Sequence, residues 1–295
     1  MESGRFYEGI HMMPEAIREA EKLLISEKDY QEKKELFQTD KKAFYNEILK
    51  ERDFRIRFLY YYSRMACETY AYYQRKKIED KIYWDTFYDL TIWCENCFRK
   101  YGEYGIAQYD WFFRHIECRI FRLGRLEFEK MKSEWELTDD RIQINKGDDV
   151  ISVHIPEGGK LEPEQIRDSY RQAYEFWGME CPYICHSWLL YPGLSDVLGE
   201  NSNILKFQKQ YRILKTDFIE REAEERIFGT IQENPEKYQE ETSLQRRAKQ
   251  YLLSGKQLGN GTGVLLFTPC RAPRCTASGR QSDGFRASVP RQRRL

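Results

Sequence analysis

An imidazole at the end of an expected strand is the first candidate for chemistry in this sequence. Residues 151–156 read Ile-Ser-Val-His-Ile-Pro, so apolar residues alternate with Ser152 and His154 at the period of a strand. The alternation predicts that His154 lies on the face opposite the apolar residues, just before Pro156 ends the strand. Such a histidine suits a general base, because its ordinary pKa lies near neutral pH; the alternative is a hydrogen-bonded structural histidine.

A carboxylate on a second expected strand is the other candidate base. Glu127 follows Gly124 within residues 121–129, and a glycine inside a strand usually marks a bulge or a close approach by a backbone or ligand. Beside a cleft, Glu127 could deprotonate an ammonium group. The alternative is a cross-strand ion pair with Arg122 or Arg125.

A thiol and a second imidazole occur together in the expected strand over residues 182–191. Strand alternation separates Cys185 from His186, so these neighbours cannot form a nucleophile and base pair. A covalent route through Cys185 would need an imidazole from a neighbouring strand, for which His154 is the obvious residue. Otherwise His186 simply faces the other layer.

Glycines near the end of the chain are candidates for holding a diphosphate. Lys256, Gly259 and Gly261 lie in a segment whose backbone N–H groups could converge on a phosphate. The segment precedes an expected strand instead of opening a helix, so a glycine-rich hairpin turn is the alternative.

Two pairs of soft ligands have spacings that permit zinc. They are Cys94 with Cys97, and His115 with Cys118, each pair at i and i+3. Both pairs lie among Trp and Phe residues, where small buried thiols are common, so we expect core packing and no metal.

The elements that must position these residues change type at about residue 120. From residue 14 to 115, apolar residues recur at three and four positions, which predicts a helical bundle. After residue 120, period-two segments alternate with a helical stripe over 163–177. The fold class predicted is α+β, with an N-terminal helical bundle followed by a mixed sheet with flanking helices.

Composition excludes several classes of protein. The chain has 48 Lys plus Arg and 48 Asp plus Glu, so no overall field attracts nucleic acid. No segment approaches the roughly 20 apolar residues that span a bilayer, so no membrane partner is expected. Eight cysteines without dense spacing in 295 residues indicate reduced thiols, and we expect a cytoplasmic protein.

Four short motifs in fixed order carry a family resemblance. They are Leu123-Gly-Arg-Leu-Glu-Phe128, Val153-His-Ile-Pro156, Cys185-His-Ser-Trp-Leu-Leu190 and Ser202-Asn-Ile204, with Trp84-Asp-Thr-Phe-Tyr-Asp89 in the helical part. Over about residues 6–267, the chain resembles bacterial acyltransferase domain-containing proteins with an N-terminal helical acyltransferase domain and a GNAT-like C-terminal domain. The resemblance implies a helical domain at 1–118 and a GNAT-like domain at 119–267.

The resemblance also implies an activity. A CoA-dependent N-acyltransferase moves an acyl group from acyl-CoA, a co-substrate and not a bound cofactor, to a small-molecule or peptide amine. In GNAT domains the pantetheine lies along a splayed strand, and backbone N–H groups at a helix start hold the diphosphate. GNAT domains usually have, between a strand and a helix, a loop with the pattern Arg/Gln-x-x-Gly-x-Gly/Ala, where x is any residue. This sequence lacks such a loop, and residues 256–261 are the nearest approximation to it.

A non-catalytic GNAT-like binding or regulatory module is the alternative function. An open cleft lined by His154 and Glu127 would favour the enzyme, whereas a cleft filled by Trp188 or Tyr side chains would favour the module.

The C-terminal tail, residues 268–295, gives the first testable prediction. It holds seven Arg, one Asp and no Lys, with too few large apolar residues to contribute to a core, so we expect a disordered or extraneous tail. A chain ending at Phe267 should therefore keep the thermal melting midpoint of the full chain. A midpoint lower by more than a few degrees would show that the tail packs on the fold.

Overall fold

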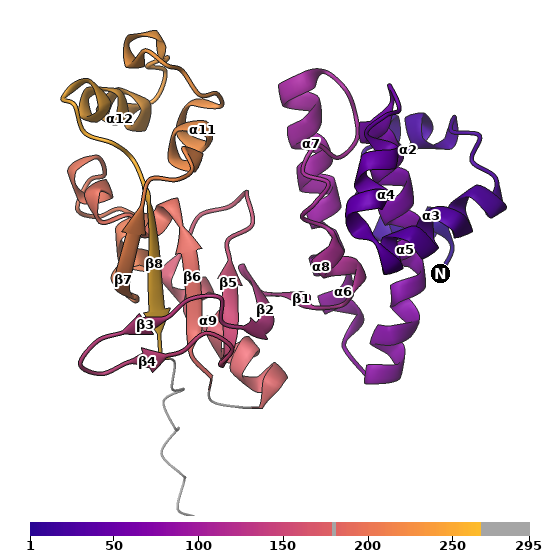
Figure 1. Ribbon diagram of the computed structural model, residues 1–295, viewed down its shortest axis with the longest axis horizontal. Helices are drawn as coiled ribbons and strands as arrows, with labels where there is room; N and C mark the ends of the chain where they lie inside the picture. The colour runs from indigo at the N-terminus through magenta and orange to yellow at the C-terminus, as the bar shows by residue number, and fades with distance from the viewer. Residues whose placement is uncertain (179–180, 267–295) are drawn as a thin grey trace, which may run out of the picture.

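The computed structural model describes residues 1–178 and 181–266. The tail expected at 268–295 therefore lies outside the described residues. Within them, the predicted α+β fold is confirmed: helices come first and a mixed sheet follows (Figure 1).

The N-terminal half is helical, as the three-and-four spacing of its apolar residues predicts. Its helices are α1 (Ser3–Gly9), α2 (Pro14–Glu21), α3 (Glu27–Thr39), α4 (Lys41–Ile48), α5 (Phe54–Lys76), α6 (Asp80–Phe87), α7 (Asp89–Tyr101) and α8 (Phe113–Ile116). Helix α7 ends at Gly102, whose φ of 69° is the left-handed conformation that terminates helices at little cost.

The second half contains the strands and shorter helices. They are β1 (Ile120–Leu123), β2 (Leu126–Lys132), β3 (Leu137–Thr138), β4 (Gln143–Ile144), β5 (Asp149–His154), α9 (Pro163–Trp177), β6 (Tyr183–Ser187), η1 (Trp188–Leu190), η2 (Pro192–Asp196), α10 (Asn203–Gln208), β7 (Arg212–Asp217), α11 (Glu222–Phe228), η3 (Pro235–Lys237), α12 (Ser243–Leu253) and β8 (Asn260–Leu265).

Six strands form the main sheet in the order β1-β2-β5-β6-β8-β7. Strands β5 and β6 run parallel and α9 connects them, while the other neighbouring pairs run antiparallel. Gly124, expected inside a strand, instead lies with Arg125 in the turn between β1 and β2, where Leu123 and Leu126 are partners. The φ of Gly124 is 73°, and a Cβ there would lie 2.8 Å from Oγ of Ser169.

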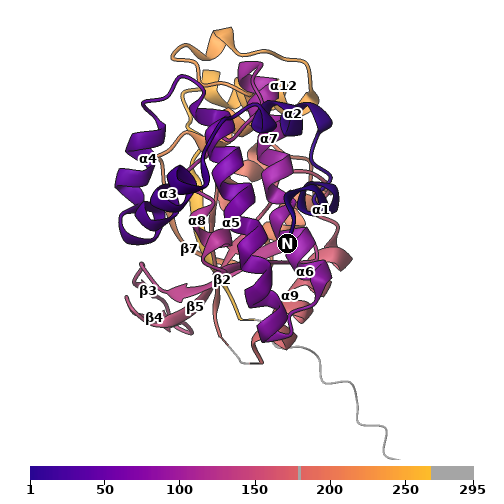
Figure 2. The same ribbon diagram turned by 90° about the vertical axis from the view of Figure 1, so that its right-hand side faces the viewer.

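Each face of the sheet is covered by helices. On one face, the rings of Phe128 and Tyr183 lie 5.7 and 5.2 Å from the ring of Tyr170 in α9. On the other face lie the helices of the first half, and the backbone N–H of Arg122 donates to Oγ1 of Thr86 in α6 at 2.9 Å. Figure 2 shows α5 and α7 in front of the strands.

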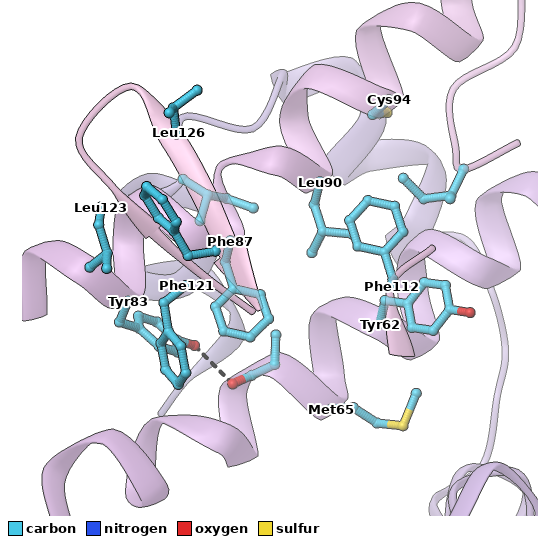
Figure 3. Packing of buried hydrophobic residues seen from close by; sticks show 14 of the residues in the cluster. Tyr62, Met65, Tyr83, Phe87, Leu90, Cys94, Phe112, Phe121, Leu123 and Leu126 are labelled. Atoms are coloured by element: carbon cyan, nitrogen blue, oxygen red, sulfur yellow. Dashed lines mark hydrogen bonds between the residues drawn. The ribbon is translucent and has the colours of Figure 1, made fainter. Parts of the chain in front are cut away.

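One hydrophobic core continues through both halves. Figure 3 shows Leu90 of α7 and Phe112, just before α8, in the same region as Phe121 and Leu126 from the β1–β2 hairpin, and all are buried. Such close packing makes the orientation of the two halves specific. No helix in the described ranges is both long and apolar enough to cross a lipid bilayer.

A smaller core lies under α11 and α12, which occupy the upper left of Figure 1. Its buried residues include Leu194, Val197, Ala223, Phe228 and Leu252. Trp188 and Ile204 pack against both this cluster and the main core, so they join the two.

Gly261, a candidate for diphosphate binding, has a packing role in the fold. A Cβ at this position in β8 would lie 2.3 Å from the carbonyl oxygen of Leu190 in η1. Gly261→Ala should therefore destabilise the protein by about 1–3 kcal/mol, seen as a lower thermal midpoint.

The matched control for that variant is Gly199→Ala, because a Cβ at Gly199 meets no atom within 4 Å. Gly199→Ala should melt close to wild type. A Gly261→Ala protein that melts normally but binds CoA more weakly would instead support the diphosphate-binding role.

Candidate active site

A cavity of about 1600 Å³ lies between the helical half and the sheet. Its lining comes from α7 and the segment before α8 on one side, and from β2, β5, β6, α10 and α11 on the other. Glu127 and His154 both line it, as do Trp93, Trp111 and Trp188. The cleft is therefore open, and Trp188 forms part of its wall without filling it.

The cavity reaches the junction of the two parallel strands. Strands β5 and β6 are partners at Ile151 with Tyr183 and at Ser152 with Ile184. Beyond those pairs, residues 153–156 and 186–189 line the same cavity. Where the pairing of two parallel strands ends, their backbone N–H and C=O groups no longer bond to each other and can bind a ligand.

His154 lies at this junction, on the face that the helical half covers. It is the strand partner of Glu127, and its ring lies 5.0 Å from the ring of Trp111 in an edge-on arrangement. Its Nε2 lies 3.5 Å from Oε2 of Glu129. Burial lowers the pKa of His154 below its usual value and Arg114 acts in the same direction, while Glu129 opposes them.

Glu129 is a site residue that the sequence reasoning missed. It is buried, and its carboxylate lies 3.1 Å from Nε of Arg114 and 2.7 Å from Nη2 of Arg119. Burial alone would raise its pKa, but the contact with His154 and the charges of Arg114 and Arg119 lower it. Glu129 is therefore ionised, and its position two residues after Glu127 on the same face was the available signal.

Glu127 differs from Glu129 in having no close countercharge. It is 1% exposed, and its Oε1 has no hydrogen-bond partner among the described residues. Arg122 is its partner on β1, but neither Arg122 nor Arg125 forms an ion pair with it in the described part of the chain. Burial, and then the charge of Asp89, raise the pKa of Glu127 well above its usual range.

Asp89 brings the helical half into the site. Its Oδ2 accepts a 2.8 Å hydrogen bond from Nε1 of Trp111 and lies 3.5 Å from Nε2 of His115. Burial raises the pKa of Asp89 to about 6 even though Trp111 and Arg122 act to lower it. Burial lowers the pKa of His115 to about 3, so this imidazole is neutral.

One group of three side chains in the described residues has donor atoms close enough to share a cation. Asp89, His115 and Glu127 each supply an oxygen or nitrogen, and these atoms lie within 4.8 Å of one another. The thiols expected to pack do not belong to this group. Burial raises the pKa of Cys94 to about 12 and that of Cys97 to about 11.

The side chains of Cys185 and His186 point to opposite faces of β6 and have different surroundings. Cys185 is fully buried on the α9 face, where burial raises its pKa far above the usual range, and the structure does not bring it to His154. His186 lies on the face of His154 and lines the edge of the cavity. Its Nδ1 lies 2.8 Å from Oγ1 of Thr262, and its ring stacks on Trp135.

The remaining predicted residues lie outside the cavity lining. Lys256 forms an ion pair of 2.9 Å with Asp196. Gly259 lies against β7, where a Cβ would approach the carbonyl oxygen of Asp217 to 2.5 Å, and Gly261 packs on η1.

A glycine loop between β5 and α9 was missed. Gly158 and Gly159 have φ values of 89° and 70°, and residues 155–162 line the cavity. The guanidinium of Arg125 donates to the carbonyl oxygens of Pro156, Gly159 and Lys160 at 2.9, 3.2 and 3.3 Å. The signal was a Gly-Gly pair between a strand and the Pro163 that begins a helix.

Both halves of the chain match known domain families. Residues 1–118 match the N-acyltransferase N-terminal domain, and residues 120–265 match the GNAT-like C-terminal domain. No protein among the curated sequences matches the chain.

Solved structures of acyltransferases share the fold. One in complex with decanoyl-CoA has a TM-score of 0.64 and 24% identity, over 74% of this chain and 68% of that chain. One in complex with decanoyl-CoA and teicoplanin has a TM-score of 0.60 and 22% identity, over 70% of this chain and 65% of that one. A mutant in complex with octanoyl-CoA has a TM-score of 0.61 and 21% identity, over 72% and 66% of the two chains.

This chain thus spans about two thirds of the length of these acyltransferases. Because its two halves match in the order in which the fold presents them, the chain belongs to the acyltransferase family that joins an N-acyltransferase N-terminal domain to a GNAT-like C-terminal domain.

Proposed function

We propose that this chain is a CoA-dependent N-acyltransferase that transfers an acyl group from acyl-CoA to an amine. The observation that carries the proposal is the position of His154, which lines the cavity where β5 and β6 part and faces Glu129 at 3.5 Å. Acyl transfer to an amine requires a proton acceptor where the thioester and the amine meet. The division into domains at 1–118 and 119–267 is part of this proposal.

The loop between β5 and α9 is our candidate for the CoA diphosphate. Arg125 binds carbonyl oxygens on one side of the loop, and in a trans peptide the N–H points away from the carbonyl, so amide groups face the opposite side. Helix α9 begins directly after the loop and its N-cap, Glu162, makes no side-chain hydrogen bond to the first turn. The free N–H groups and the helix dipole there favour an anion.

We propose this location in preference to the segment 256–261 that the sequence suggests for the diphosphate. Lys256, Gly259 and Gly261 do not line the cavity, and the two glycines are explained by close packing. The replacement also restores the order of strand, glycine loop and helix that a GNAT-like domain implies.

In the proposed reaction, His154 takes the excess proton of the amine. Nε2 of His154 lies 3.5 Å from Oε2 of Glu129, and this carboxylate favours the tautomer with the proton on Nε2 and the lone pair on Nδ1. The amine nitrogen attacks the thioester carbonyl, a C–N bond forms and the carbonyl electron pair moves to oxygen. The C–S bond then breaks, and the imidazolium returns the proton to the departing CoA thiolate.

The donor proposed is an acyl-CoA with a medium-length chain. Structures with the same fold are described in complex with decanoyl-CoA and octanoyl-CoA, and one also contains teicoplanin. The cavity of about 1600 Å³ exceeds the roughly 300–1,000 Å³ of ordinary ligand pockets, which suits a donor and an acceptor bound together.

The role of His154 can be tested by substitution. His154→Ala should lower kcat for acyl transfer from decanoyl-CoA by ~10²–10⁴-fold, because a positioned proton acceptor is lost. The affinity for decanoyl-CoA, measured by calorimetry, and the melting midpoint should stay near wild type, since His154 is partly exposed. A normal kcat in His154→Ala, with the large loss appearing in Glu127→Gln, would move the base to Glu127.

The pH profile gives a second test. The rate should fall with decreasing pH as His154 becomes protonated, at a pH below its ordinary pKa of 6.5, because the folded protein lowers this pKa. Glu129→Gln removes the charge that raises the pKa, so the acidic limb should move to lower pH. Arg114→Gln removes a charge that lowers the pKa, so the limb should move to higher pH. If neither variant moves the acidic limb, that limb does not report His154.

A further inference from the structure

Asp89 and Glu127 come from the two different domains and meet at the cavity wall. Asp89 begins α7, Glu127 lies in β2, and both side chains line the cavity. They are 2% and 1% exposed, respectively. Two carboxyl groups at one buried place are costly unless a positive charge joins them.

The charged side chains around Asp89 and Glu127 indicate which further charge this site could bind. Arg122 acts on both carboxyl groups, and its buried Nη1 has no hydrogen-bond partner in the described chain. Arg226 also faces Asp89 but pairs with Glu157 and Glu222. Arg125 also acts on Glu127, although its guanidinium is engaged with the 156–160 loop. If both carboxyl groups are ionised, their charges and that of Arg122 sum to −1, which either one monovalent cation or one proton would balance.

The acceptor atoms are arranged for a group with several N–H donors. Among the residues that the structure describes, Oε1 of Glu127 and both ring nitrogens of His115 have no hydrogen-bond partner. His115 is fully buried and neutral, so it offers a lone pair. With Asp89 these side chains supply three acceptor atoms within 4.8 Å of one another, which matches the three N–H donors of a primary ammonium group.

Trp111 fixes the position of this acceptor set. Its indole N–H donates to Oδ2 of Asp89 at 2.8 Å, and the same ring lies beside His154. Because His154 is the strand partner of Glu127, a cation held by Glu127 and Asp89 would lie next to the proposed base.

We propose that Asp89 and Glu127, backed by His115, form the subsite that binds the ammonium group of the acceptor, so that the acceptor is a primary amine bound as a cation. The inference rests on the proposed acyl transfer and adds the class of acceptor and the residues that select it. In the empty site a proton shared by the two carboxyl groups takes the place of the cation, in keeping with their raised pKa values. Binding of the ammonium displaces this shared proton to solvent. The ammonium then gives one proton to the carboxyl pair, the free amine attacks the thioester, and neutral His154 takes the remaining excess proton of the nitrogen.

The test uses decanoyl-CoA as the donor and 2-phenylethylamine as the acceptor probe. Asp89→Asn and Glu127→Gln should each raise KM for the amine by about 10- to 100-fold, the usual effect of losing a charged hydrogen-bond partner. The affinity for decanoyl-CoA, measured by calorimetry, should stay unchanged in both variants. Asp85→Asn, one turn earlier in α6, is the matched control: this half-buried carboxylate pairs with Lys81 and does not line the cavity, so the variant should keep the wild-type KM.

The outcomes separate this inference from the proposed function. Wild-type protein that neither binds nor turns over decanoyl-CoA would overturn the acyltransferase proposal itself. If wild type is active and both variants keep its KM for the amine, the ammonium subsite is wrong.

A further measurement needs no variant. Elemental analysis of the untreated protein should find no stoichiometric divalent cation. A bound dication whose chelation lowers the melting midpoint would overturn the assignment, because it would occupy the three acceptor atoms.

Discussion

The structure depends on burying charged side chains between its two halves. Strand β2 directs Glu127 and Glu129 to the face that the helices cover, and both are almost fully buried. A buried carboxylate is tolerated only with compensating partners. For Glu129 the compensation comes from Arg114 in α8 and from Arg119 beside it. The helical half is therefore as necessary to the reactive face as the sheet that carries it, and neither half alone would hold these residues in place.

Much of the fold could be predicted, because the spacing of apolar residues within a segment indicates whether that segment forms a helix or a strand. The change from helices to strands near residue 120 follows from hydrophobic spacing, and so does the position of His154 opposite the apolar residues of its own strand. The pairing of those two residues in register depends on the turn at Gly124 and on the order of strands, which no local pattern contains. The predicted roles of the site residues remain predictions.

What the sequence could not supply was the contribution of distant contacts. Gly261 looks like part of a phosphate loop until the carbonyl of Leu190 is seen to lie against it. In the sequence, Gly158 and Gly159 look like an ordinary turn. In the structure, carbonyl oxygens of this loop accept hydrogen bonds from the guanidinium of Arg125. Asp89 lies at the start of an aromatic helix, and only the tertiary structure brings it to Glu127. In each case, the role of the local motif depends on contact with a residue more than 25 positions away in the sequence.

The contacts of Glu157 have a mechanical consequence for the cavity. Glu157 accepts hydrogen bonds of 2.7 and 2.8 Å from Asn96 and Arg99 of α7, and lies 3.6 Å from Arg226 of α11. Arg99 is 65% exposed, so such a surface pair contributes only about 0–1 kcal/mol, whereas breaking a buried pair such as that of Glu129 costs about 3–5 kcal/mol. The cavity wall around Glu157 is thus held more weakly than the wall around Glu129. Salt should therefore weaken the contacts of Glu157 more than those of Glu129, so this part of the wall can shift to fit a large ligand while the geometry around the imidazole is kept.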